Sequence, residues 1–120
     1  MTARRRARGV TWAQVVQTAH RLPGVHDGTS YGTPALFVRK KLFIRLRDDD
    51  ESIAVRTDPV SRDLLLRADP AMYFLTDHYL NYPWILVKLS AADADALAER
   101  IEDAWRLVAG KRLIAERVGR

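Results

Sequence analysis

The apolar residues of this chain change their spacing twice, and that change limits the fold more than any other feature of the sequence. Between residues 12 and 22 they recur every three or four positions, which is the period of a helix with one buried face. Over 42–47 and 53–56 they alternate with polar residues, which is typical of strands with one buried face. Helical spacing returns over 97–108. This pattern predicts an α+β domain with a central hairpin between helices.

Capping and turn residues divide the pattern into elements. Thr11 is a favourable N-cap for the first helix, and Pro23-Gly24 ends that helix. Asp58-Pro59 predicts the start of a second helix, because Asp caps helices well and Pro fits the first turn. Further short strands are predicted within 29–38, 72–75 and 84–89. The expected order is α-β(2-3)-α-β(2)-α, an α+β fold with a mostly antiparallel sheet and its helices on one face.

Length and charge indicate one domain with basic ends. The chain has 120 residues, 48% of them apolar, which suffices for one core. The net charge of +5 is concentrated at the ends: residues 1–8 contain four arginines and no acid, whereas 9–109 contain 12 basic and 14 acidic residues. We therefore expect a flexible basic arm over 1–10, a single domain over 11–113 and a basic C-terminal tail over 114–120.

The composition also excludes several classes of protein. Cysteine is absent, so disulfides, thiolate chemistry and Cys-based zinc sites are excluded. No stretch has the roughly 18 apolar residues that a membrane span needs, and the arginine-rich start lacks the apolar segment of a signal peptide. We expect a cytoplasmic protein with no membrane partner.

A set of short motifs links the chain to a known family. In order they are Leu22-Pro23-Gly24-Val25, Gly28-Thr29-Ser30-Tyr31-Gly32-Thr33-Pro34-Ala35, Lys41-Leu42-Phe43, His78-Tyr79, Leu86-Val87-Lys88-Leu89, Ala104-Trp105-Arg106 and Lys111-Arg112-Leu113. In this order, from Trp12 to Leu113, they resemble the MmcQ/YjbR proteins. The resemblance implies a small YjbR-like α+β fold, similar to secretion chaperones and to a double-wing DNA-binding domain. It also implies a non-enzymatic DNA-binding protein, and it supplies no catalytic residues.

The sequence departs from the family pattern at two positions. Lys40 occupies a hairpin position where glycine is common, and Gly110 occupies a position where proline is frequent. If the backbone at Lys40 needs a positive φ, a residue other than glycine is strained there by roughly 1 kcal/mol. Gly110 is also where we expect the last helix to end.

No catalytic, metal or cofactor site is predicted. Residues 28–32 match the G-x-S-x-G pattern of a hydrolase, but the strand before it and the helix after it are missing, so we expect a structural turn. Asp77 and His78 could be named as the triad partners of Ser30, but they are adjacent, and adjacent residues of an extended chain point apart. The three histidines lack the spacing of a zinc site. The acidic run 48–51 lacks the spacing and glycine of a calcium loop.

The leading hypothesis is a nucleic-acid surface on the polar side of the hairpin. Alternation places an aromatic ring and two arginines on one face of the strand 42–47, with cations of neighbouring strands beside them and three more at the hairpin tip. The residues are Phe43, Arg45, Arg47, Arg56, Lys88, Arg39, Lys40 and Lys41. Such groups neutralise phosphates and stack on bases, so we expect DNA binding mainly through the phosphate backbone. The alternative is a solvated face whose charges pair with nearby Asp and Glu.

A second hypothesis comes from the aromatic residues of the loops. The rings at Tyr31, His78, Tyr79, Tyr82 and Trp84 fall in the glycine-rich and tyrosine-rich segments. Amphipathic rings of this kind can line a ligand cleft or a protein-binding surface, or they can form the edge of the core. The chain is then a protein- or small-ligand-binding module.

Overall fold

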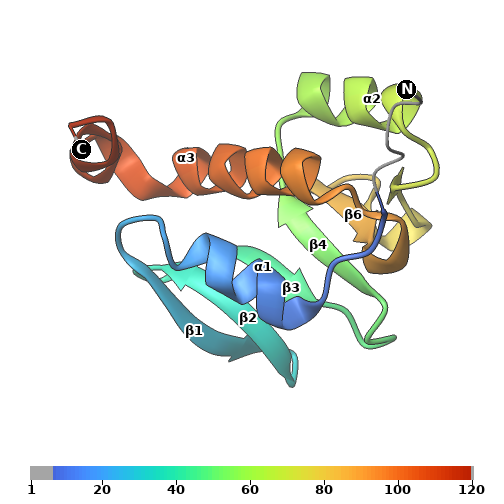
Figure 1. Ribbon diagram of the computed structural model, residues 1–120, viewed down its shortest axis with the longest axis horizontal. Helices are drawn as coiled ribbons and strands as arrows, with labels where there is room; N and C mark the ends of the chain where they lie inside the picture. The colour runs from blue at the N-terminus through green and yellow to red at the C-terminus, as the bar shows by residue number, and fades with distance from the viewer. Residues whose placement is uncertain (1–6, 120) are drawn as a thin grey trace, which may run out of the picture.

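The computed structural model describes residues 7–119 and has a six-stranded sheet with three α-helices (Figure 1). The elements are α1 (Trp12–Ala19), β1 (Val25–Ser30), β2 (Thr33–Val38), β3 (Lys41–Leu46), β4 (Ser52–Arg56), α2 (Pro59–Ala68), β5 (Tyr73–Phe74), the 3-10 turn η1 (Asp77–Tyr79), β6 (Trp84–Lys88), the 3-10 turn η2 (Leu89–Ala91) and α3 (Ala94–Val118). The strand order is β1-β2-β3-β4-β6-β5, and all neighbours are antiparallel. The predicted α+β class is confirmed.

The sheet has more strands before α2 than the expected two or three. Four are present, because β1 begins at Val25, directly after the Pro23–Gly24 turn. This edge strand carries His26, Asp27 and Gly28, so it lacks the apolar alternation by which the other strands are recognised.

One face of the sheet carries the core. Helices α1 and α3 pack on this face, which Figure 1 shows toward the viewer. Trp105 of α3 is fully buried, and its indole Nε1 donates a hydrogen bond of 2.9 Å to the carbonyl oxygen of Pro23. Since α1 and α3 cover this face, the opposite face of the sheet is left for the loops between the strands.

The predicted helix caps at Thr11 and Asp58 are confirmed. The Thr11 hydroxyl accepts from the backbone N–H of Gln14, whose side chain reciprocally accepts from the Thr11 N–H. The Asp58 carboxylate accepts from the N–H and the hydroxyl of Ser61, and the Ser61 amide is the main reason that the pKa of Asp58 is lowered. Helix α3 is capped by Asp93, whose carboxylate accepts from the N–H of Ala96.

Residues beside both ends of the described range make contacts that the sequence does not predict. At Gly110 the backbone takes φ 81° and kinks α3, but the helix continues to Val118 through most of the predicted tail. At the other end, the Arg8 guanidinium lies 2.7 Å from the Asp69 carboxylate. The Gly9 N–H donates a hydrogen bond of 2.9 Å to the carbonyl oxygen of Ala92. The rest of the predicted arm, residues 1–6, lies outside the described residues. Within residues 7–119, no helix is long and apolar enough to cross a bilayer.

A β-bulge changes which side chains of β3 face the core. Leu36 pairs with Ile44, but the next residue, Phe37, pairs with Leu42, so Phe43 is an extra residue in the ladder. Phe43 is 0% exposed and belongs to the core with Ile44, whereas Leu42 lies on the opposite face. The prediction of Phe43 as a nucleic-acid-binding residue is therefore wrong, because alternation assumes a ladder without bulges.

Candidate functional site

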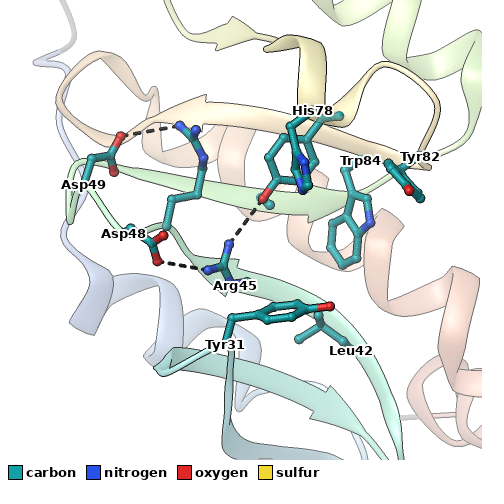
Figure 2. A pocket seen from close by; sticks show the side chains of 11 residues that line it. Tyr31, Leu42, Arg45, Asp48, Asp49, His78, Tyr82 and Trp84 are labelled. Carbon is teal, nitrogen blue, oxygen red and sulfur yellow. Dashed lines mark hydrogen bonds and ion pairs between the residues drawn. The ribbon is translucent and has the colours of Figure 1, made fainter.

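A pocket of about 730 Å³ lies on the face of the sheet that α1 and α3 leave open. Leu42 and Ala54 contribute apolar surface from β3 and β4, and aromatic residues surround it. Figure 2 shows Tyr31 on one side of the pocket and Trp84 and Tyr82 on the other, with Arg45 beside Tyr31. The five residues predicted for a ligand cleft, Tyr31, His78, Tyr79, Tyr82 and Trp84, all line this pocket.

Arg45 is the most enclosed cation of the pocket, with a side chain only 12% exposed. Its Nε donates to the carbonyl oxygen of Ser30, its Nη1 to the Tyr79 hydroxyl, and its Nη2 to the Asp48 carboxylate at 3.1 Å. A guanidinium has five N–H donors, so two of them, one on each Nη, are left for another acceptor. Arg45 is thus held in place at the pocket with donors to spare.

Arg47 lines the same pocket and is also held by its own hairpin. Its Nη1 donates to the Ser52 hydroxyl at 2.8 Å and approaches the Asp49 carboxylate at 3.4 Å. Its guanidinium lies over the rings of Phe74 and Tyr79, 5.7 Å from each centroid. Both arginines therefore pair with acidic residues of the next turn, Arg45 with Asp48 and Arg47 with Asp49, as the alternative interpretation of this face expects.

The acidic turn after β3 is built around Asp49. Burial would raise the pKa of this carboxyl, but hydrogen bonds from the amides of Glu51 and Ser52, the Ser52 hydroxyl and the charge of Arg47 outweigh burial and lower it. Asp48, in contrast, is 84% exposed and contacts Arg45 alone among the ion pairs of residues 7–119. Asp49 is therefore structural, whereas the pair between Asp48 and Arg45 is solvated and weak.

Tyr31 enters the pocket from the turn between β1 and β2. Tyr31 and Gly32 take φ values of 52° and 82°, the two positive angles of a type I′ hairpin turn. Of the motif at 28–32, residues 28–30 belong to β1 and only Tyr31 and Gly32 form the turn, so the strand that we expected to be missing before Ser30 is present. The segment after the motif is the strand β2 and not the helix of a hydrolase site. The Tyr31 ring is 91% exposed, and the Arg45 guanidinium lies 5.5 Å from its centroid.

The tyrosine-rich loop that forms the other wall is held by Arg62 of α2. The Arg62 guanidinium donates to the carbonyl oxygens of Tyr79, Leu80 and Tyr82, at 3.4, 3.2 and 2.9 Å. Three carbonyls of one loop are thus fixed by one side chain. Arg62 could not be predicted from the sequence, since it lies on a helix and no local pattern connects it to the loop.

Several predicted nucleic-acid-binding residues lie outside the pocket. Arg56 donates to the carbonyl oxygen of Leu42 and lies over the ring of Trp84 at 4.9 Å, so it holds Trp84 in the pocket wall. Burial lowers the pKa of Arg56. Lys88 is exposed and pairs across the ladder with Ser52.

The remaining cations form the tip of the hairpin between β2 and β3. Arg39, Lys40 and Lys41 are exposed there, and none of them takes part in the ion pairs of residues 7–119. The positive φ of this turn, 55°, falls on Arg39 rather than on Lys40.

Comparison with known proteins agrees with the motifs. A family model described as YjbR matches residues 20–107. The chain belongs to the YjbR family. The matched segment contains the pocket residues, from Tyr31 to Trp84, and both arginines that point to it. The predicted resemblance to MmcQ/YjbR proteins is thereby confirmed.

Similar proteins share the fold or part of the sequence. Two uncharacterized mycobacterial proteins, Mb2600 of Mycobacterium bovis and Rv2570 of Mycobacterium tuberculosis, are each 38% identical over 50 residues, 42% of this chain. The match spans 39% of the length of each relative. The crystal structure of the Deinococcus radiodurans protein DR2400, a DUF419 domain, superposes with a TM-score of 0.70 at 17% identity, covering 91% of this chain and 88% of that one. This likeness establishes the fold.

Proposed function

We propose that this protein binds a small anionic organic molecule in the pocket on the open face of its sheet. The observation that carries the proposal is that the Arg45 side chain, only 12% exposed, is fixed by three hydrogen bonds at an aromatic-lined pocket and still has N–H donors without a partner among them. Ligand sites are usually concave, mostly apolar and equipped with few, well-placed polar groups. A ligand carboxylate or phosphate would accept from Arg45 in charge-assisted hydrogen bonds, which are stronger than neutral ones.

The Asp48 carboxylate competes with a ligand anion for Arg45. Its carboxylate is 84% exposed, so it pairs with Arg45 through a contact that water screens. A ligand anion that displaces this carboxylate exchanges a weak ion pair for a better enclosed one. Asp48 is therefore a competitor of the ligand, and its removal should favour binding.

The proposal is tested by calorimetric titration of the protein with naphthalene-2-carboxylate. Arg45→Gln should weaken binding about tenfold or more, since hydrogen bonds to charged groups contribute roughly 1.5–3 kcal/mol. Asp48→Asn should strengthen binding several-fold, because it removes the competing carboxylate and leaves Arg45 in place. Arg112→Gln removes the same charge as Arg45→Gln from an exposed position in the C-terminal part of α3.

The two substitutions in the pocket make opposite predictions, so a general loss of folding cannot imitate both. Circular dichroism of each variant reports whether its fold is retained. If Asp48→Asn leaves the affinity unchanged and Arg45→Gln weakens binding no more than Arg112→Gln does, the pocket is not the anion site.

DNA is a second candidate, supported by the cationic tip at Arg39, Lys40 and Lys41. Exposed cations without acidic neighbours attract phosphates regardless of base sequence. The side chains of Arg45 and Arg47 are only 12% and 22% exposed, so the exposed tip is the part of the predicted surface best placed to reach the phosphates of a duplex. Labelled duplex DNA titrated across a salt series should bind less tightly, and with a smaller salt slope, after all three tip residues are changed to Gln. Equal salt slopes for the original protein and the variant would show that the tip does not contact the DNA phosphates.

A further inference from the structure

We infer, resting on the function proposed above, that the anion bound in the pocket is carried on a planar aromatic ring, which Tyr31 holds against the wall formed by Trp84. Binding would then depend on the aromatic rings, and on the backbone of the turn that presents Tyr31, as well as on charge.

The exposure and backbone of Tyr31 are the first observation. A ring that is 91% exposed contributes little to the core. Its residue also has φ 52°, a conformation that disfavours residues other than Gly, Asn and Asp. In a type I′ turn Asn would serve the backbone better than Tyr. A strained residue with an unburied ring is explained if the ring is used for binding.

The opposite wall is the second observation. Trp84 lines the pocket and is braced by the Arg56 guanidinium 4.9 Å from its ring. Beside it, Tyr82 lies 6.1 Å from His78, ring centroid to ring centroid, and its loop is tied to Arg62. Figure 2 shows this wall facing Tyr31 across the pocket. The two aromatic surfaces come from separate elements and share one space.

Together with Arg45, the two aromatic surfaces favour a ligand that is flat and negatively charged. Flat rings stack on flat rings better than on bulky saturated ones. The Arg45 guanidinium, beside Tyr31, would receive the anionic group. Two kinds of molecule carry this chemistry: aromatic carboxylates and mononucleotides, in which the ring is a base and the anion a phosphate.

The test compares probes that differ in one property at a time. Naphthalene-2-carboxylate should bind at least tenfold more tightly than decahydronaphthalene-2-carboxylate, which has equal charge but no aromatic plane. It should also bind tenfold more tightly than the neutral naphthalene-2-carboxamide. AMP and ribose 5-phosphate differ in the same way, since only AMP carries an aromatic base. Tighter binding of AMP than of ribose 5-phosphate would identify mononucleotides as the ligand class.

Variants of Tyr31 assign the preference to its ring. Tyr31→Phe should retain the preference for the aromatic probe. Tyr31→Ala should weaken the binding of naphthalene-2-carboxylate about tenfold and that of decahydronaphthalene-2-carboxylate less than twofold. If the saturated and aromatic anions bind equally, and both depend on Arg45, the inference fails while the proposed function stands. If no anion binds in an Arg45-dependent way, the proposed function fails and the inference with it.

Discussion

Tyr31 is expected to cost the protein stability, and the cost can be worked out from its conformation. A residue other than glycine pays roughly 1 kcal/mol for φ near 52°. Asn tolerates this region, so Tyr31→Asn should recover that amount. It also loses the cation–π contact with Arg45, which at an exposed site contributes about 0.5 kcal/mol. Tyr31→Asn should therefore stabilise the fold by about 0.5 kcal/mol.

Tyr31→Ala is the matched control, because alanine loses the same ring but keeps the unfavourable φ. It should destabilise the fold by about 0.5 kcal/mol, so the two variants should differ by about 1 kcal/mol. For a chain of 120 residues this corresponds to melting temperatures about 4 °C apart. Both variants should bind naphthalene-2-carboxylate more weakly than the original protein.

Differential scanning calorimetry measures the difference directly. Equal melting temperatures for Tyr31→Asn and Tyr31→Ala would refute the backbone argument. A loss of more than about 6 °C in both would show that the ring packs against the fold, contrary to its exposure.

Three further predictions follow from the fold and the loop. Phe43→Ala should destabilise by about 3–5 kcal/mol in denaturant unfolding, since its ring is in the core; a change below about 1 kcal/mol would place the ring at the surface. Asp58→Ala should cost about 1 kcal/mol at pH 7. The pKa of Asp58 is lowered by folding, so its contribution to stability is present above the unfolded pKa near 3.9 and is lost as pH falls through the folded value. If Asp58→Ala destabilises the protein equally at all pH values, this explanation is contradicted. Arg62→Gln should speed hydrogen exchange of the Leu80 and Tyr82 amides about tenfold, because loop carbonyls lose a charged donor; unchanged exchange would show that the loop holds itself.

The elements that rest on local chemistry could be predicted from the sequence. Thr11 and Asp58 cap helices because their side chains reach amides three residues away, a distance that the sequence fixes. The grouping of Tyr31 with the tyrosine-rich loop was also predictable, since both segments are turns that carry amphipathic aromatic rings. The apolar spacing in turn located the two helices that cover the sheet.

The features that the sequence concealed depend on pairing between strands or between distant side chains. The bulge at Phe43 inverts the alternation before it, and only the register with Phe37 reveals it. Strand β1 carries too many polar residues to show a strand pattern, because it lies at the edge of the sheet. The engagement of Arg47 by Asp49 depends on how the hairpin folds back on itself.

Nuclear magnetic resonance tests the central claim most directly, because it locates the ligand as well as detecting it. On titration with naphthalene-2-carboxylate, the largest shift changes should fall on the Arg45 Nε–H, the Trp84 indole N–H and the amides of Tyr31 and Gly32. Resonances of the tip, Arg39 to Lys41, should stay in place. Shifts confined to the tip, or the absence of any shift at Arg45 and Trp84, would contradict a ligand site in this pocket.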